Sequence, residues 1–552
     1  MILPPPRETL RASVVVPARD EEDLIEACLD ALAAQQGVTA DEYEVLLVLD
    51  GCEDETEARA RRFASEHPAL ALHLLHGPGR GAGRARRVGM DEACSRLVSV
   101  GRPGGLVAST DADTVVAPDW LRAQLDAAAR GARAIGGRIE LRDDEDLVQG
   151  VREWRAARGR EKQMELLAED TGGGTAEHWQ FSGASLALTA EVYAEVGGLE
   201  PRAALEDEQL ERALERCGIP IERSLAVRVM TSARTVGRAK RGLARDLALA
   251  SWVRSNTFDR GDFDPAMLAE RKAASGATVS VILPMGGKGR GTSALLDALA
   301  PLTEAGLIDE EIVLCREAKD LSSRGDARFY PDADLLPGHG PVRGYGDALW
   351  RGLAVSGGEI LLFLDPAAPD PDGRRALGLV GPLLLREELH LVKGFSPVGS
   401  GGDEIGARGL SELVARPLIN LYRPELAGFV DPVSAEFSAR RSLLASLPFP
   451  VGYGASLSLL LDAHEWKGVD ALAQVCLGER PEARVPTPDL GEAAYATLTA
   501  AMSRTGEDDL GEHAPGPLFL PLPGHPTSLG QRRVAVEERP PLASLGPPRS
   551  GR

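Results

Sequence analysis

Two aspartates separated by one residue, Asp111 and Asp113, have side chains suited to a definite chemistry. They follow an apolar run that begins at Leu106, and Asp50 ends another apolar run. In open α/β sheets, ligands bind beyond the carboxyl ends of the strands, so residues in these positions can contact a ligand. Two such carboxylates can hold Mg²⁺ or Mn²⁺, and the ion can bridge the two phosphates of a nucleoside diphosphate and stabilise it as it leaves. A solvated turn is the alternative, because short acidic patterns are common in a chain with 83 acidic residues.

The segments that must position these aspartates alternate between two kinds of pattern. Residues 13–17, 44–50 and 106–111 are apolar runs typical of buried strands. Residues 24–36 and 55–67 carry apolar side chains at helical spacing. Strands that alternate with helices in this way predict an open α/β sheet.

The second half of the chain repeats this order of segments. Apolar runs recur at 278–284, 311–315 and 359–365, so that Pro284 corresponds to Pro17 and Asp365 to Asp111. A repeat of such a long period indicates a duplicated domain rather than a solenoid.

The length of 552 residues also favours more than one domain, because it exceeds what a single core supports. We expect domains at 10–260 and 277–503, with a boundary in the polar stretch 256–277. Residues 504–552 are rich in proline and glycine, and we expect a tail that lies on the second domain or is partly disordered.

The bulk composition excludes several classes of protein. With 43% hydrophobic and 26% charged residues, the chain has the balance of a soluble globular protein. Its net charge of −21 argues against binding nucleic acid. Six scattered cysteines without a CxxC pair argue against a zinc site and a disulfide framework. The sequence has neither an apolar run of about 20 residues nor a signal-peptide pattern, so we expect no transmembrane segment and a cytoplasmic location.

The order of motifs in the first half is more specific than any one of them. PARDEE follows the first strand, VLDG the second, GRGAGRARR precedes the third, and TDAD is followed later by the acidic pair in LEDEQL. This order resembles that of the family-2 glycosyltransferases, from about Ser13 to Arg238. The resemblance implies a GT-A fold and a nucleotide-sugar donor. It implies that the nucleotide pocket is lined by Pro17, Ala18 and Glu21, that Asp50 contacts the base, and that Asp113 binds the metal with Asp111 beside it near the ribose. Arg84 would lie near the nucleotide, although a surface arginine is equally expected there.

The same resemblance extends to the acceptor side. The segment FSGASLA, which contains Gly183, is similar to the acceptor-side segment of the family, and LEDEQL is similar to its Glu-Asp motif. In inverting members the aspartate of that motif is the general base, which implies that Asp207 accepts the proton of the acceptor hydroxyl and that Glu206 belongs with it to the catalytic pair. A helix start that favours acidic residues is the alternative. Arg234 and Arg238 would face the diphosphate or an acidic acceptor.

From about 279 to 541 the chain resembles the glucosyl-3-phosphoglycerate synthases. The matching stretches include GDALWRGLAVSGGEILLFLD, SELVARPLINLYRPEL and LPFPVGYGASLSLLLD. Asp365 and Glu436 keep the acidic residues of that pattern, but its other functional positions are changed: loop 284–289 has no acidic residue, Ala367 replaces the second metal carboxylate, Tyr345 replaces a lysine, and Glu482 replaces a histidine. We therefore predict that the second domain is a degenerate transferase that serves for support, acceptor binding or dimerisation.

These observations favour a metal-dependent transferase that moves a hexose from a UDP- or GDP-sugar to a small hydroxyl acceptor, with 3-phosphoglycerate as the candidate that the second half implies. The Glu-Asp motif suggests inversion, whereas the synthases retain configuration, and the sequence leaves this open. Two alternatives also stay open: a regulatory protein that binds a sugar nucleotide or phosphoglycerate without turnover, and a transferase with a lipid or polysaccharide acceptor. A dinucleotide-dependent oxidoreductase is excluded because no GxGxxG follows either first strand. The resemblance also implies a homodimer.

Overall fold

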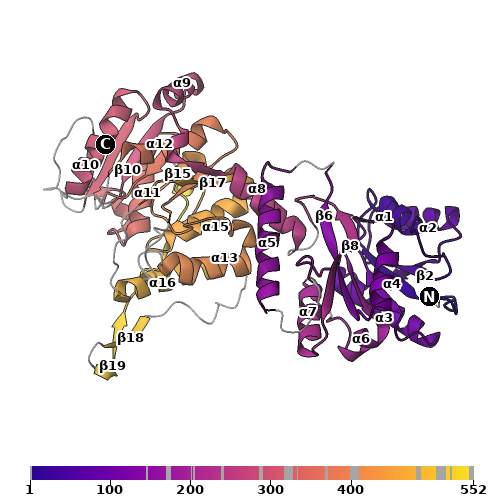
Figure 1. Ribbon diagram of the computed structural model, residues 1–552. Helices are drawn as coiled ribbons and strands as arrows, with labels where there is room; N and C mark the ends of the chain where they lie inside the picture. Colours follow the sequence, from indigo (N-terminus) through magenta and orange to yellow (C-terminus); the bar gives the residue numbers. More distant parts are fainter. Residues whose placement is uncertain are drawn as a thin grey trace. The chain divides into compact units, whose positions relative to one another are not determined.

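The computed structural model divides the chain into two compact units, Met1–Ser251 and Trp252–Arg552, which are described separately (Figure 1). Each unit is built on an eight-stranded mixed sheet with helices, so the predicted α/β class is confirmed. The structure describes residues 3–143, 147–169, 176–200, 202, 205–237, 242–284, 290–315, 327–331, 334–366, 371–397, 409–479, 487–504, 518–522 and 525–545.

The sheet of the first unit has the strand order β3-β2-β1-β4-β7-β6-β8-β5. The strands β1 to β4 run parallel, and β7 is antiparallel to both of its neighbours. The carboxyl ends of β1, β2 and β4 therefore meet at one edge. The strands are β1 (Ala12–Ala18), β2 (Tyr43–Leu49), β3 (Leu72–His76), β4 (Leu106–Ser109), β5 (Thr114–Val116), β6 (Ala134–Leu141), β7 (Leu186–Thr189) and β8 (Ile221–Thr231).

Helices cover both faces of this sheet, which explains why β1 and β2 are buried along their whole length. Side chains of successive strand residues point to opposite faces, so Val14 and Val16 pack in one core and Val15 in the other. The first core includes residues of α1, α2 and α4, and the second includes residues of α3, α6 and α7. The helices are α1 (Ile25–Ala33), α2 (Thr56–Glu66), α3 (Ala82–Ser99), α4 (Trp120–Ala129), α5 (Val151–Glu169), α6 (Ala190–Glu195), α7 (Glu206–Arg216) and α8 (Leu243–Ser255).

The sheet of the second unit has the order β12-β11-β10-β13-β15-β14-β17-β9. The relative directions of neighbouring strands match those of the first sheet except at the last position, where β9 is parallel to β17 but β5 is antiparallel to β8. This correspondence is the structural counterpart of the sequence repeat. The strands are β9 (Thr257–Asp259), β10 (Val279–Leu283), β11 (Glu310–Cys315), β12 (Arg328–Pro331), β13 (Ile360–Phe363), β14 (Leu391–Phe395), β15 (Phe437–Arg440) and β17 (Leu472–Cys476).

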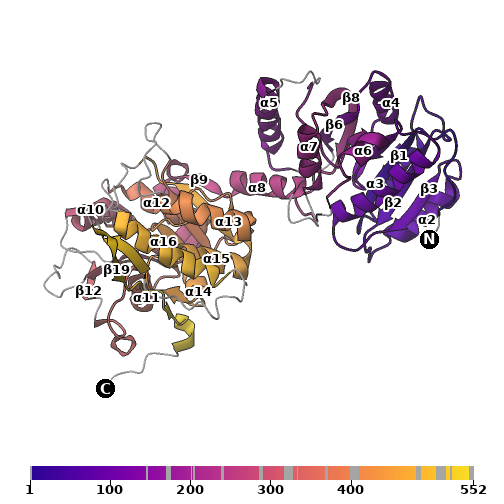
Figure 2. The ribbon, with the colours of Figure 1, turned by 90° about the horizontal axis from the view of Figure 1, so that it is seen from below.

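The helices of the second unit also surround a sheet that is buried on both faces, and α15 and α16 lie side by side (Figure 2). A π-helical turn, Ser411–Ala415, leads directly into α13. The helices are α9 (Pro265–Ser275), α10 (Arg290–Glu304), α11 (Tyr345–Val355), α12 (Gly373–Leu385), α13 (Arg416–Tyr422), α14 (Arg441–Leu444), α15 (Ala455–Lys467) and α16 (Thr487–Met502).

The boundary between the units falls earlier than position 260, where the sequence predicts that the first domain ends. Strand β9 pairs with β17 and therefore belongs to the second sheet. The polar composition of residues 256–277 suggested a linker, but backbone pairing and the packing of Phe263 and Leu268 incorporate this stretch into the second core. In the part of the chain that the structure describes, no helix is long and apolar enough to cross a membrane.

Part of the predicted C-terminal tail is packed into the second unit. The strand β20 (Glu538–Arg539) pairs with β16 (Phe449–Pro450). The buried guanidinium of Arg539 donates to both oxygens of Asp347, at 2.9 and 2.6 Å, and Arg351 donates to the same carboxylate at 3.3 Å. A further hairpin is formed by β18 (Leu518–Leu522) and β19 (His525–Arg532).

Candidate active site

The carboxylates predicted from sequence lie at the edge of the first sheet where β1, β2 and β4 end. Asp111 and Asp113 follow β4, Asp50 follows β2, and Glu21 lies in the loop after β1. Parallel strands with matched ends explain why residues so far apart in the chain converge here. Pro17 and Ala18 are part of β1 itself, at its carboxyl end.

Arg234, just beyond the end of β8, contacts two of these carboxylates. Its guanidinium donates to both oxygens of Glu21, at 2.9 and 2.7 Å, and lies 2.8 Å from an oxygen of Asp113. Burial raises the pKa of Asp113 to about 6, and Asp111 adds to the rise while Arg234 opposes it. Arg234 therefore supplies positive charge at the position where a metal ion would meet Asp113.

A second arginine, Arg86 on α3, joins Asp111 beyond β4 to Glu206 at the start of α7. Its buried guanidinium donates to Asp111 at 2.6 Å, to Glu206 at 3.0 Å, to the hydroxyl of Ser109 and to the carbonyl of Gly183 at 3.0 Å. Burial raises the pKa of Glu206, and Arg86 opposes that rise. A bonded, buried Glu206 is thus a structural partner of Arg86.

Asp207 lies at the start of α7, beside Gly183. One of its oxygens accepts the backbone N–H of Gly183 at 3.1 Å. Leu205, which precedes α7, has a positive φ of 60°, a strained conformation for a residue other than glycine. Gly183 leaves no room for a side chain, because a Cβ there would lie 2.6 Å from Cζ of Arg86. The acceptor-side residues are therefore held closely around one guanidinium.

Asp50 has a clear structural role in the loop between β3 and α3. Its two oxygens accept the backbone N–H groups of Gly79 and Gly81, at 2.7 and 2.8 Å. The carboxylate is buried and holds the segment that leads to Arg84 and Arg86. Contact of Asp50 with a nucleotide base stays a prediction.

The structure thus brings together most of the predicted residues of the first unit. Glu21 and Asp113 meet through Arg234, and Glu206 lies near Asp111 and Gly183 through Arg86. Arg84 is half-buried on α3, and Arg238 lies outside the described residues. Sequence reasoning selected Arg84 and missed Arg86, although both are in the same GRARR stretch. Helical spacing was the available signal, because it turns Arg86 toward the sheet together with the buried Gly83 and Met90.

One further acidic group lies near the nucleotide loop. The side chains of Asp20, Cys52 and Asp54 lie within 4.8 Å of one another, close enough to share an ion. The two carboxylates already accept backbone N–H groups, of Glu53 at 2.7 Å and of Glu22 at 3.0 Å. These bonds explain the cluster as an anchor between two loops.

Comparison with known proteins agrees with this geometry. The sequence model of Glycosyl transferase family 2 matches residues 13–184, which confirms the family resemblance of the first half. Glucosyl-3-phosphoglycerate synthase of Mycobacterium tuberculosis is 38% identical over 291 residues, which cover 50% of this chain and 88% of that protein. The chain belongs to the glucosyl-3-phosphoglycerate synthase family. It is accordingly a nucleotide-sugar-dependent glycosyltransferase.

Other members of this synthase family and related structures are similar over comparable lengths. The synthase of Petrotoga mobilis is 31% identical, with 46% of this chain and 77% of that protein covered. A crystal structure of mannosyl-3-phosphoglycerate synthase from Rubrobacter xylanophilus is 32% identical, has a TM-score of 0.49, and covers 54% of this chain and 98% of that chain. A crystal structure of the M. tuberculosis synthase in complex with Mn²⁺, uridine diphosphate and phosphoglyceric acid is 36% identical, with a TM-score of 0.45, covering 52% and 98%.

At the corresponding edge of the second unit, the described residues include two polar side chains with partners within the unit. The hydroxyl of the half-buried Tyr345 donates to the carbonyl of Ala435 at 2.8 Å, and desolvation raises its pKa, with Asp365 and Glu436 adding to the rise. Glu436 forms a buried ion pair with Arg375 of α12. Glu436 is thus paired with a cation, and Asp365 lies near enough to Tyr345 to affect its pKa. Ala367, Glu482 and most of loop 284–289 lie outside the described residues.

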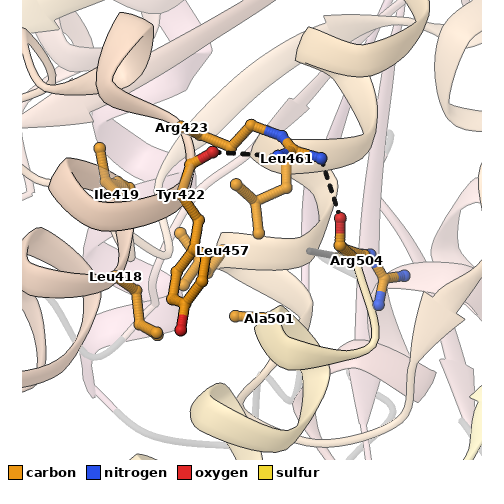
Figure 3. Close-up of a pocket in the computed structure, with 8 residues that line it drawn as sticks. All are labelled: Leu418, Ile419, Tyr422, Arg423, Leu457, Leu461, Ala501 and Arg504. Atoms are coloured by element: carbon orange, nitrogen blue, oxygen red, sulfur yellow. Dashed lines mark hydrogen bonds between the residues drawn. The ribbon is translucent and has the colours of Figure 1, made fainter. Parts of the chain in front are cut away.

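A pocket in the second unit is too small to hold a sugar nucleotide (Figure 3). It lies between α13, α15 and the end of α16, where Arg423 donates to the carbonyl of Arg504 at 3.0 Å. Its volume is about 10 Å³, enough for one water molecule at most. Ligand pockets are normally about 300 Å³ or larger, so this one is a gap in packing. It is lined by Leu418, Ile419, Tyr422, Arg423, Leu457, Leu461, Ala501 and Arg504.

Proposed function

We propose that the first unit transfers a hexose, glucose in the first instance, from a UDP- or GDP-sugar to 3-phosphoglycerate with the help of Mg²⁺ or Mn²⁺. The names of the relatives support glucose as the donor sugar and 3-phosphoglycerate as the acceptor. The single observation that carries the proposal is the buried Arg86, which links Asp111 on the metal side to Glu206 and Gly183 on the acceptor side. The diphosphate of the donor and the hydroxyl of the acceptor can therefore bind on the two sides of the Arg86 guanidinium.

The donor set fits a divalent cation. Asp111 and Asp113 offer hard carboxylate oxygens, and Glu21 lies close to Asp113 through their common partner Arg234. A bound Mg²⁺ or Mn²⁺ would neutralise charge on the leaving diphosphate. Asp113 would be its principal protein ligand, and Asp111, held by Arg86, would lie toward the ribose.

The protein residues would perform the remaining tasks. Asp207 would accept the proton of the acceptor hydroxyl, in a position fixed by its bond to the N–H of Gly183. Glu206 would hold Arg86 rather than move a proton. A base on the acceptor side predicts inversion at the anomeric carbon, whereas the resemblance to the synthases implies retention, so the configuration of the product tests the role of Asp207 directly.

We further propose that the second unit is a second, inactive GT-A domain that begins before β9 and includes the described part of the C-terminal tail. The repeated strand order supports this assignment. The hydrogen bond of Tyr345 and the buried Arg375–Glu436 pair, which engage side chains at its sheet edge, support the loss of activity. Acceptor binding by this unit, a homodimer and a cytoplasmic location stay predictions.

The test is release of nucleoside diphosphate from a panel of UDP- and GDP-sugars with Mn²⁺ or Mg²⁺, with and without 3-phosphoglycerate. We expect release that requires metal and increases with the acceptor. Asp113→Asn and Asp365→Asn form a matched pair, since each removes one carboxylate charge beyond a corresponding strand. Loss of turnover in Asp365→Asn alone would move the active site to the second unit. Sugar-nucleotide binding without turnover in the wild type would favour a regulatory protein.

A further inference from the structure

Three carboxylates, Glu21, Asp111 and Asp113, lie close to two guanidinium groups at the edge of the first sheet. The two arginines differ in their surroundings. Arg86 is 3% exposed and is bonded on the metal side and the acceptor side at once. Arg234 is 29% exposed and pairs with the carboxylates of Glu21 and Asp113. Arg234 is therefore the arginine that can change partners at low cost.

The contacts of Arg234 are unequal. Its pair with Glu21 is a bidentate hydrogen bond, at 2.9 and 2.7 Å, whereas its contact with Asp113 is an ion pair whose N–O distance is 2.8 Å. A bidentate pair fixes the plane of a guanidinium, and a single contact can be exchanged while that pair remains. Asp113 is also the carboxylate that a cation must reach. The guanidinium of Arg234 and the cation therefore compete for the carboxylate oxygens of Asp113.

We propose that Arg234 is an exchangeable counter-ion of the donor site: it neutralises Asp113 when no cation is bound, releases Asp113 to the cation, and then pairs with the diphosphate of the donor while it keeps Glu21. This inference rests on the proposed function, because it takes the same site to bind a metal and a nucleoside diphosphate. It makes Arg234 a positioning residue that couples binding of the cation to binding of the diphosphate.

The proposal predicts opposite effects of one substitution in two measurements on the full chain. Arg234→Gln removes the charge but keeps much of the side-chain bulk. We expect Mn²⁺ alone to bind this variant about tenfold more tightly than the wild type, because Asp113 is no longer shared with a guanidinium. We also expect UDP to increase Mn²⁺ affinity less in Arg234→Gln than in the wild type, since the diphosphate has lost its cationic partner.

Free Mn²⁺ measured by electron paramagnetic resonance gives both quantities without turnover. Arg234→Lys keeps the charge and should bind Mn²⁺ as weakly as the wild type. Arg61→Gln is the matched control: Arg61 is an exposed arginine paired with Glu57 on α2, and its loss changes net charge without touching the site. Thermal melting provides a second readout, because Mn²⁺ should raise the melting temperature of Arg234→Gln more than that of the wild type.

Unchanged or weaker Mn²⁺ binding in Arg234→Gln would overturn the proposal, as would an equal gain in Arg61→Gln. If UDP increased the Mn²⁺ affinity of Arg234→Gln as much as that of the wild type, the proposed pairing of Arg234 with the diphosphate would be overturned. Failure of both wild type and Arg234→Gln to bind Mn²⁺ would refute the metal site and this inference together. Mn²⁺ binding that follows the predicted pattern in a protein that releases no UDP would sustain the exchange while refuting the proposed transfer reaction.

Discussion

Replacing Arg86 by methionine tests the central contact of the candidate site. The substitution keeps an unbranched side chain on α3 but removes the charge that Glu206 and Asp111 share. Asp111 is 34% exposed and can be hydrated, whereas Glu206 is 7% exposed. The cost of Arg86→Met therefore arises mainly at Glu206, as an unpaired carboxylate in a buried place.

The stability cost of Arg86→Met has an upper limit, because Glu206 can become neutral by taking up a proton. Starting from the ordinary value of 4.5, protonation at pH 7.5 costs about 4 kcal/mol, and at pH 5.5 it costs about 1.4 kcal/mol. Breaking a buried ion pair typically costs 3–5 kcal/mol, so roughly this limit should be reached at pH 7.5. Loss of the bonds to Ser109 and Gly183 adds about 1–2 kcal/mol at either pH.

Native-state hydrogen exchange followed by mass spectrometry on the full chain measures this effect in the first unit separately. Peptides from β1, β4 and α7 report the free energy of opening. We expect Arg86→Met to lower the free energy of opening by about 4–5 kcal/mol at pH 7.5. At pH 5.5 the decrease should be smaller by about 2–3 kcal/mol. Release of nucleoside diphosphate should be lost in parallel.

Arg96→Met is the matched control on the same helix. Arg96 forms a buried pair with Glu44, at 2.8 and 2.7 Å, away from the sheet edge that carries the site. The variant should lose comparable stability while its turnover at low temperature stays near that of the wild type. The reasoning about Arg86 is refuted by a cost below about 1 kcal/mol, by a cost independent of pH, or by equal loss of activity in Arg96→Met.

Three further predictions follow from the first unit. Asp113→Asn should lower metal-dependent diphosphate release about 100-fold or more, while Asp365→Asn stays within about twofold of the wild type in the same assay; equal losses would contradict this. Gly183→Ala should displace Arg86 and destabilise the first unit by about 1–3 kcal/mol in hydrogen exchange, and an unperturbed variant would show that the close approach is relieved elsewhere. Burial lowers the pKa of His178 from 6.5 to about 4, so the unfolded state takes up a proton first as the pH falls. Stability from His178 should decrease by about 2 kcal/mol between pH 7.5 and 5, and His178→Gln should reduce this pH dependence; an identical dependence would count against it.

The parallel half of each sheet could be predicted from the sequence. Residues 13–17 and 44–50 are continuous apolar runs because β1 and β2 are buried on both faces, and such runs are visible without a structure. Strand β8 (Ile221–Thr231) was not predicted, because it mixes buried and exposed side chains along its length. The edge strand β9 lies in a stretch whose composition predicts a linker, because its residues are polar or half-buried.

The carboxylates of the site could also be predicted, since they directly follow strands and the ends of parallel strands converge. The arginines that balance the charge of these carboxylates could not be predicted. Arg86 lies among Arg84 and Arg87, and only the packing of α3 against the sheet selects which arginine is buried. The pairing of Arg234 with Glu21 joins residues from opposite ends of the unit, and no local pattern encodes it. Family resemblance supplied candidate roles, but not the cations that hold these residues.

The two units treat the same electrostatic problem differently. A sheet edge rich in carboxylates is costly unless positive charge lies nearby. In the second unit Arg375 pairs with Glu436, and both side chains are 5% exposed. The first unit has a similarly buried pair in Arg86 and Glu206, but it also has Arg234, which is 29% exposed and lies beside Asp113. We therefore propose that the exposure of the arginine, as well as the number of carboxylates, distinguishes the sheet edge of the first unit from that of the second.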